Sequence, residues 1–541
     1  MFSPATVAAR ADASPRRRKG KAVGGKVAGG APQVDDTVIP EARSLAAPWW
    51  QRMFVLDLWS LAVFRVGLAL VILADTLVAI SNAEAFYSDA GVLPRTAMYE
   101  LSWADQGFWS LHALGGSVAY QVTLMCVQLV SALCLLAGHR TRLATFVCWL
   151  LLASLDSRNL LINNGADSMI RMLAFWSIFL PLGARWSLDA RASAGRGPGS
   201  WADRDATWIS FAGACLILQV VFVYWFSVAF KSHEVWWSQG TALRQVLALD
   251  VYARPLALWV REHPDLCRWL THGTLALEIL GPLLALLPFW SARFRMVAVA
   301  AMISLHAGIA LCLDIGAFPW IMMAAWCAFL PREFWIWLGK KEGQSGEAGM
   351  QESSVDVSAP LPRRSPLALR RVVNGFLAIC LGLVFMWNLR GTNFAYWEQY
   401  FPRSVNPLVL KLRLDQYWTM FAPTPLREDG WFILRAGLSD GSEVDLLRDG
   451  APVDWRKREN LHTHFKDSRW LKYLMNLWLK ANHTHRPLYG DFIARTWNET
   501  HGGLSQVVAW QLWFVMEETQ PDGTDGTRLQ PVLMHEREKF P

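Results

Sequence analysis

Long apolar runs separated by short polar links fill most of the chain between residues 58 and 387. A run of about 20 apolar residues can cross the hydrocarbon core of a bilayer as a helix. The pattern predicts about nine such helices, at 58–80, 118–137, 143–155, 169–182, 208–230, 270–288, 296–312, 318–330 and 372–387. We therefore expect an all-α polytopic membrane bundle.

The pattern changes after the last apolar run. Residues 431–438 and 443–447 alternate between apolar and polar around Ser439-Asp440-Gly441-Ser442, which is a hairpin signal. Residues 466–481 have helical spacing, whereas 505–517 and 529–534 have the alternation of strands. We therefore expect residues 390–541 to form a small α+β domain outside the membrane.

The polar links predict an orientation. Residues 1–45 are rich in Ala, Gly, Pro and basic residues and contain no apolar core of signal-peptide length, so we expect a disordered tail. Basic links lie on the same side of the predicted spans as this tail, at 140–142, 185–204, 293–295 and 340–371. The positive-inside rule assigns that side to the cytoplasm. Residues 54–338 then form the main membrane domain, 339–371 a cytoplasmic linker, 372–389 the last span, and 390–541 a periplasmic or luminal domain, most simply at a bacterial inner membrane.

The composition is typical of a membrane protein and argues against a nucleic-acid-binding protein. Hydrophobic residues make up 53% of the chain and charged residues 18%, respectively above and below the usual globular fractions. The net charge of +7 comes mainly from basic tails and links, which suits an anionic membrane face. No zinc-finger spacing or RNA-binding aromatic motif occurs, so we expect no nucleic-acid partner.

Cysteines and histidines do not suggest a metal site. Seven of the eight cysteines lie within apolar runs, and there is no CxxC, so we interpret them as packed hydrophobic side chains. His462/His464 and His483/His485 have a spacing that suits surface loops or strands better than a metal site on a helix. We predict no metal.

Lys231 ends the apolar run at 208–230 and is followed by His233, two tryptophans and Gly240. Two interpretations remain open for this lysine. It could snorkel, with its stem in lipid and its ammonium among the headgroups. It could instead be partly desolvated among aromatic side chains, which lowers the pKa of an amine and makes it a base.

Several other charged or titratable residues lie within the predicted spans. Such residues are costly in a bilayer and tend to face functional cavities. They are Arg65, Asp75, Arg171, Glu278 and His306, with Lys231, His233 and Asp314 at the outer ends of spans. Asp167 and Arg171 have an i,i+4 spacing that permits an ion pair. We expect some of these groups to share a polar cavity, although each alone is also compatible with a structural role.

A family resemblance covers about half the chain, from residue 54 to about 335. Six segments carry it in order: LAVFRVGLAL, FYSDAGVLPR, NNGADSMIRMLAFWSIFLPLGARWSLD, YWFSVAFKSHEVWWSQGTAL, THGTLALEILGP and HAGIALCLDIGAFPWIMMAAWCAFLP. Together they resemble the HTTM domain, the membrane region shared with vitamin K-dependent gamma-carboxylase. DQYWTMFAPTPLREDGW and SRWLKYLMNLW resemble the C-terminal extension of bacterial members.

The resemblance implies a chemistry. In the carboxylase, a lysine at the position of Lys231 deprotonates the hydroquinone of vitamin K, oxygenation generates a strong base, and CO2 traps the resulting glutamate carbanion. It implies Lys231 as the catalytic base, with a reduced quinone, O2 and CO2 as reactants and a protein as a possible substrate. The residues that we expect to line the cavity are Asn163, Asn164, His233, Trp237, Gly240, Glu278 and His306.

Two positions depart from the carboxylase pattern. Ser232 follows Lys231 where the carboxylase has a second lysine, and Gly165 follows the two asparagines where it has a histidine. Three functions therefore remain open: a quinol-dependent oxygenase or epoxidase, a non-catalytic membrane module that binds a lipid, quinone or partner protein, and a transporter. The sequence contains no clear inverted repeat to support the last.

Overall fold

The computed structural model describes residues 48–102, 108–193, 207–339, 366–392, 402–520, 522–524, 527–528 and 531–538. The predicted N-terminal tail lies outside these ranges. So do most of the predicted cytoplasmic linker and part of the basic link at 185–204.

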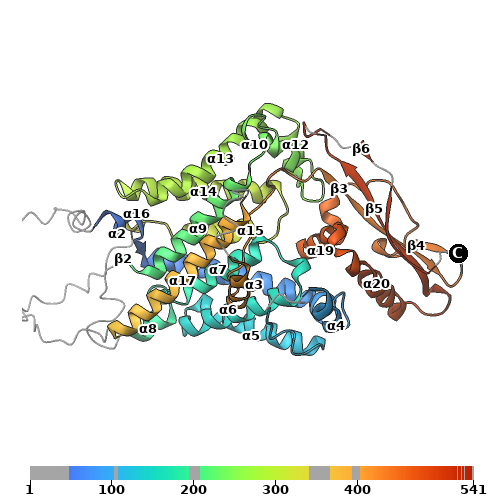
Figure 1. Cartoon of the computed structure of the whole chain (residues 1–541), viewed down its shortest axis with the longest axis horizontal. Helices are drawn as coiled ribbons and strands as arrows, with labels where there is room; N and C mark the ends of the chain where they lie inside the picture. Colours follow the sequence, from blue (N-terminus) through green and yellow to red (C-terminus); the bar gives the residue numbers. More distant parts are fainter. Residues whose placement is uncertain are drawn as a thin grey trace, which may run out of the picture. The chain divides into compact units, whose positions relative to one another are not determined.

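Each of the nine predicted apolar runs contains a helix (Figure 1). The helices are α3 (Leu58–Ser81), α5 (Val118–Ala137), α6 (Thr141–Arg158), α7 (Gly165–Ser177), α9 (Phe211–Phe230), α13 (Pro264–Leu286), α14 (Ser291–Cys312), α15 (Phe318–Cys327) and α17 (Leu367–Gly391). Six of those in the described ranges are long and apolar enough to cross a membrane: α3, α5, α9, α13, α14 and α17. The protein therefore has the helices of a multi-pass membrane protein.

The other three helices differ from the predicted spans. Helix α15 has 10 residues and α7 has 13. At 1.5 Å per residue, α15 extends only about 15 Å, half of a hydrocarbon core of about 30 Å. Helix α6 has 18 residues but ends with Asp156 and Arg158, which lower its mean hydropathy. These three helices lack the length or apolar character of independent spans.

Local capping determines where the principal helices begin. Asp57 accepts a hydrogen bond from the Trp59 amide at 2.7 Å at the start of α3. Ser210 caps α9 in the same way, accepting from the Gly213 amide at 3.1 Å. Such caps satisfy amides that have no partner within the helix.

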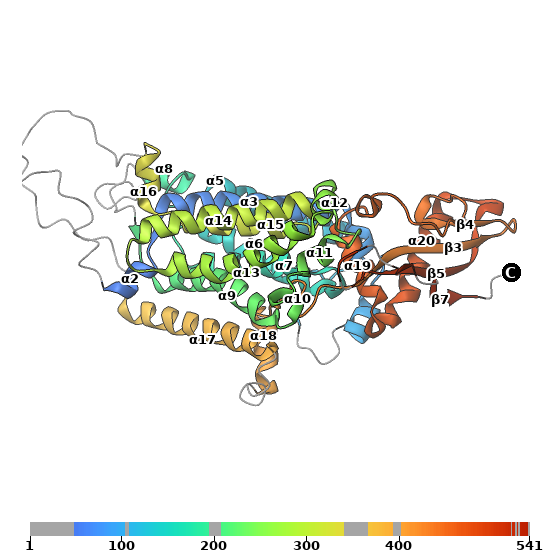
Figure 2. The same cartoon turned by 90° about the horizontal axis from the view of Figure 1, so that it is seen from above.

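Helix α9 lies at the centre of the bundle and packs against α7, α13 and α17. Within its most apolar stretch of 18 residues, 72% of α9 is buried in the protein. The corresponding share for α17, which lies along one side of the bundle (Figure 2), is 22%. Close contact between α3 and α15 requires a small residue, because a Cβ on Gly67 would lie 2.7 Å from Ala324 Cβ. Helix α9 therefore carries its C-terminal residue, Lys231, into the protein interior.

Buried arginines tie together one end of the bundle. Arg65 donates hydrogen bonds to the carbonyl groups of Leu182, Arg185 and Trp186. Arg295 similarly donates to the Val55 carbonyl at 2.6 Å. Arg65, one of the charged residues within the predicted spans, therefore holds the chain after α7. Among the described residues, the basic links at 140–142, 185–193 and 293–295 lie at this end of the bundle.

The C-terminal region forms the predicted α+β structure. Its strands are β3 (Glu428–Leu438), β4 (Glu443–Asp445), β5 (Val507–Glu518), β6 (Thr527–Arg528) and β7 (Val532–Arg537). The sheet is antiparallel, with β3 between β4 and β5, and with β6 and β7 both paired to β5. The predicted hairpin joins β3 to β4, with Gly441 at φ +84°. Helices α19 (Ser468–Trp478) and α20 (Arg486–Thr500) lie beside this sheet, with α19 toward the membrane helices (Figure 1).

This region is not packed as a separate body. Phe432, Leu512 and Phe514 of the sheet share one hydrophobic cluster with Phe86 and Tyr87 from the segment after α3. In the segment 413–418, which precedes β3, Arg413, Leu414, Gln416 and Trp418 are buried, and Leu414 and Trp418 belong to the core of the membrane helices.

Asp429 on β3 makes a contact with the loop after α11 (Ala242–Leu247). Its carboxylate accepts hydrogen bonds from the Asp250 and Gly430 amides at 2.5 and 2.8 Å. The pKa of Asp429 is raised from 3.8 to about 7, mainly by burial and also by the Asp250 carboxylate, while the two amide hydrogen bonds and Lys457 act in the opposite direction. A raised carboxyl pKa stabilises the fold at low pH, and this contribution is lost as the pH rises from about 4 through 7.

We therefore expect the stability of the wild type relative to Asp429→Asn to fall as the pH rises. Asparagine cannot ionise, so the variant lacks this part of the pH dependence. Thermal unfolding of both proteins at about pH 5, 6, 7 and 8 measures the difference. A difference that is constant over this range would mean that Asp429 does not titrate there.

Candidate functional site

Lys231 lies at the C-terminal end of α9, and its side chain is 2% exposed. Its Nζ donates hydrogen bonds to Ser227 Oγ at 2.9 Å and to the two carboxylate oxygens of Glu278 at 2.7 and 2.5 Å. The Trp236 ring centroid is 4.9 Å from Nζ. The ammonium is therefore held inside the protein, whereas snorkelling would place it among lipid headgroups.

The sequence around Lys231 builds this environment. Tyr224, Ser227 and Lys231 have i, i+3 and i+7 spacing, which puts them on one face of α9. Glu278 reaches the same face from α13. Paired charges in a low-dielectric interior attract each other strongly, but each has lost its hydration, so such a pair is costly to maintain.

Trp237 and Gly240 shape the loop behind Lys231. Trp237 Nε1 donates to the Lys231 carbonyl at 2.6 Å, and His272 Nε2 is 3.0 Å from the Trp237 carbonyl. Gly240 has φ +66°, and a Cβ there would lie 2.7 Å from Arg268 Cγ. His233 is exposed, and its Nδ1 accepts from the Val235 amide at the start of the short helix α10 (Glu234–Trp237). These three predicted cavity residues therefore support the loop.

His306 belongs to a hydrogen-bonded chain on the same face of α9. Its Nε2 is 2.7 Å from the Tyr224 hydroxyl, which accepts from Trp326 Nε1 at 2.7 Å. The Trp326 indole N–H can only donate, so the Tyr224 hydroxyl accepts from it and can donate its own proton to His306 Nε2. With Nε2 as the acceptor, the imidazole hydrogen of His306 is on Nδ1. His306 Nδ1 has no hydrogen-bond partner in the described part of the chain.

Asn163 and Asn164 position the start of α7. Asn163 Nδ2 donates to the Asp156 carbonyl at 2.6 Å. Asn164 Oδ1 accepts from the Ala166 amide, while its own amide donates to Asp167 Oδ2, each at 2.7 Å. This reciprocal arrangement is a capping box. In the described residues, no hydrogen bond joins either asparagine to the Lys231–Glu278 pair.

Gly165 stands where the carboxylase pattern has a histidine. A Cβ here would lie 3.6 Å from Phe318 and 3.7 Å from Trp418. The Phe318 ring also packs against His306, with centroids 5.9 Å apart. Two aromatic rings therefore occupy the space that a longer side chain at position 165 would enter.

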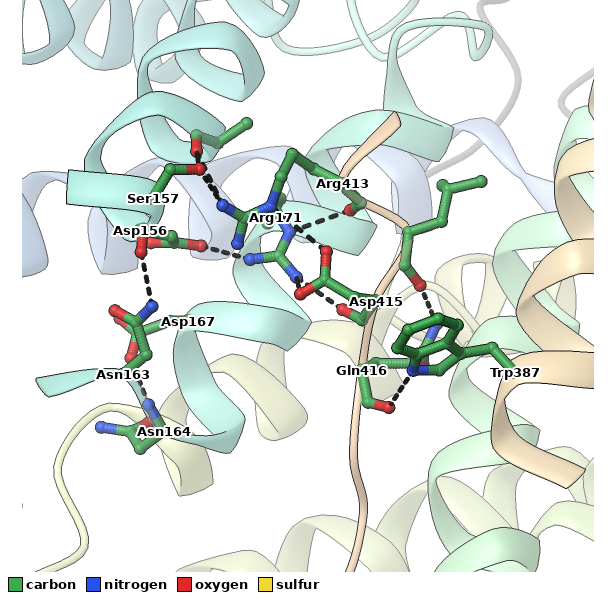
Figure 3. Close-up of polar contacts among 12 residues, drawn as sticks. Asp156, Ser157, Asn163, Asn164, Asp167, Arg171, Trp387, Arg413, Asp415 and Gln416 are labelled. Carbon is green, nitrogen blue, oxygen red and sulfur yellow. Dashed lines mark hydrogen bonds and ion pairs between the residues drawn. The ribbon is translucent and has the colours of Figure 1, made fainter. Parts of the chain in front are cut away.

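A second charged network was not predicted from the sequence. Arg171 pairs with Asp156 at 2.5 Å and donates to the main-chain carbonyls of Arg413 and Asp415 at 3.0 and 2.6 Å (Figure 3). Arg413 in turn donates to Asp415 Oδ1 at 3.2 Å and to Ser157 Oγ. Figure 3 shows how this network attaches the segment 413–418 to α6 and α7.

The ion pair that the i,i+4 spacing of Asp167 and Arg171 permits is not present among the described residues. Asp167 pairs instead with Arg469 of α19 at 3.0 Å, and Asp75 of α3 pairs with the same guanidinium at 2.5 Å. Two carboxylates hold the pKa of Arg469 well above its ordinary value even though burial alone lowers it. The C-terminal region therefore supplies the partner of Asp167, although the local spacing also permitted a pair with Arg171.

The family model of the HTTM domain matches residues 55–335, which is more than half of the 541 residues. The chain belongs to the HTTM family. No curated protein and no solved structure gave a match.

The HTTM segment contains Lys231, Glu278, His306 and both asparagines. Arg413 and Arg469 lie beyond it, yet both are buried against HTTM helices. The arginines could not be assigned to this domain from the sequence, because their contacts with HTTM residues join positions more than 200 residues apart in the chain. One sequence signal could have indicated their burial. Both arginines lie among apolar and aromatic residues, Arg413 in LKLRLDQYW and Arg469 in SRWLKYL, within a region predicted to lie outside the membrane.

Proposed function

We propose that this HTTM protein oxidises a membrane-soluble quinol with O2, and that Lys231 accepts a proton from the quinol. The supporting observation is the buried Lys231–Glu278 pair together with two buried N–H groups nearby. Trp236 Nε1 and the Nδ1 of His306 have no acceptor in the described residues. Buried donors of this kind suit a ligand that carries oxygen acceptors, as a quinol or quinone does.

The bound quinol would be oxidised by four electrons in total, so that quinol and O2 give a quinone epoxide and water, with one oxygen atom of O2 in each product. The protein would provide the base. Within the pair, Lys231 Nζ can pass a proton to Glu278 Oε2 across 2.5 Å, which leaves a neutral amine. That amine can accept a hydroxyl proton, and Glu278 retains the first one. Carboxylation of a protein glutamate by CO2 is the further reaction that family membership suggests.

The described basic links lie at one end of the bundle, which supports an orientation of the protein in the membrane. We propose that Arg65 and Arg295 mark the cytoplasmic end of the bundle in a bacterial inner membrane. Nine crossings would then require α6, α7 and α15, none of which is long and apolar enough to be assigned as a span by itself, to carry the chain across inside the bundle formed by the six longer helices. The Lys231 site and the C-terminal domain would both face the periplasm.

A second candidate is a non-catalytic module that binds a lipid, a quinone or a partner protein. The favouring observation is that the three Nζ hydrogen bonds of Lys231 are already made to Ser227 and Glu278. In this case the pair is structural, and Phe318 and Trp418 simply fill the space beside Gly165.

Purified full-length protein in lipid nanodiscs distinguishes the two candidates. We expect O2 consumption and quinol loss with a naphthoquinol or ubiquinol, and we expect Lys231→Ala to abolish both. No turnover by the wild type with either quinol would reject the enzyme. Equal turnover by a folded Lys231→Ala variant would reject Lys231 as the base.

A further inference from the structure

A cavity of about 420 Å³ lies between the membrane helices and α19. One wall is apolar and includes Leu70 and Ala74 of α3 and Trp320 of α15. Its polar end is formed by Asp75, Asp167 and Arg469, with Asn164 beside them. Lys231, Glu278 and His306 do not line it, so it is separate from the proposed quinol site. Its volume lies within the range of small-molecule sites, about 300–1,000 Å³.

The apolar wall continues onto the lipid-facing surface. Leu70 is 52% exposed and Trp320 is 56% exposed, and Ala74 is exposed between Leu70 and Leu77 on the same face of α3. Helix α3 is one of the six helices that can cross the membrane. A ligand can therefore enter from the bilayer, with hydrocarbon against α3 and a polar group against α19.

The polar end still has free hydrogen-bonding capacity. Arg469 uses only Nη2 for Asp75 and Asp167. Among the residues that the structure describes, no hydrogen bond engages Nε or Nη1 of Arg469, Oδ2 of Asp75 or Nδ2 of Asn164. The Arg469 side chain is only 5% exposed, and these atoms are not among those sealed off from water, so they are open to the cavity. Polar atoms that line a cavity and have no protein partner are available to a ligand with both donors and acceptors.

The charges indicate which polar group fits. Two carboxylates, Asp75 and Asp167, pair with Arg469 in the cavity wall. Outside the wall, Lys472 interacts with Asp167 and Asp467 interacts with Asp75. The site therefore contains both signs of charge, as a zwitterion does. A phosphate can accept from Arg469 and Asn164, whereas a primary ammonium can donate to Asp75.

We propose that this cavity binds a phospholipid with a primary ammonium headgroup, such as a phosphatidylethanolamine, taken from the surrounding leaflet. A choline headgroup has no N–H to donate to Asp75, and a glycerol headgroup has no cation. The lipid lies across the contact between α3 and α19, so it joins the HTTM helices to the C-terminal domain.

Binding of lipids to delipidated full-length protein, measured by native mass spectrometry, tests this. We expect phosphatidylethanolamine to bind about 10-fold more tightly than phosphatidylcholine with the same chains, which corresponds to one charge-assisted hydrogen bond. Ala74→Trp fills the apolar wall and should weaken phosphatidylethanolamine binding at least about 10-fold. Leu77→Trp is the matched control, because Leu77 is 55% exposed on the same helix but does not line the cavity. It should bind as the wild type does.

Three results would each overturn the proposal. Equal binding by Ala74→Trp and Leu77→Trp would mean that the lipid binds elsewhere. Equal affinity for the ethanolamine and choline lipids would remove the headgroup recognition. Competition by glycerophosphoethanolamine at the same concentration as the intact lipid would point to a soluble phosphate ligand instead. None of these results depends on quinol turnover.

Discussion

Lys231→Ala is expected to destabilise the membrane domain by about 3–5 kcal/mol, because it leaves the Glu278 carboxylate buried without its cation. Unfolding in mixed detergent micelles measures this loss. Lys411→Ala is a matched control, because Lys411 is an exposed lysine on the short helix α18 (Asn406–Leu412). Its effect should stay within about 0.5 kcal/mol. Equal stability of the two variants would mean that Lys231 is not held in a buried pair.

The double variant Lys231→Met/Glu278→Leu is expected to recover most of this stability. Replacement of a buried ion pair by apolar residues of similar volume is often neutral or stabilising, since neither charge then needs to be desolvated. A loss as large as that of Lys231→Ala would show that the pair is required for folding. Recovery makes the double variant a folded protein without the proposed base.

Arg469→Ala is the second substitution with a large expected effect. It removes the cation from two carboxylates, Asp75 and Asp167, whose side chains are 10% and 3% exposed. Loss of a buried charge partner costs about 3–5 kcal/mol. Because Arg469 joins α19 to α3 and α7, we also expect faster hydrogen exchange in the backbone amides of α19.

Arg456→Ala provides the comparison for Arg469. Arg456 pairs with Asp454, but its side chain is 85% exposed. Surface ion pairs contribute about 0–1 kcal/mol, so this variant should unfold and exchange almost as the wild type does. If Arg469→Ala behaved like Arg456→Ala, the C-terminal domain would be attached by other contacts, such as the shared hydrophobic cluster around Phe86 and Phe432.

The positions of the membrane helices could be predicted because each apolar run carries its own signal. The lengths of α7 and α15 could not, since burial inside the bundle makes short helices look like parts of longer spans. The hairpin of the C-terminal sheet was also predictable, because Gly441 and its polar neighbours form a local turn.

The pairing of charged side chains was less predictable. Lys231 and Glu278 were each chosen as candidates, but their contact joins residues 47 positions apart. The spacing of Asp167 and Arg171 permits an ion pair, whereas the structure pairs Asp167 with Arg469, 302 residues away. A local spacing says only that a contact is possible, and it does not reveal a competitor elsewhere in the chain.

The most direct measurement is O2-dependent quinol oxidation by wild type and by the Lys231→Met/Glu278→Leu variant, side by side in nanodiscs. General base catalysis contributes about 10²–10⁴-fold, so we expect a folded double variant to lose at least about 100-fold in rate. A double variant that oxidises quinol at the wild-type rate would contradict the assignment of Lys231 as the base.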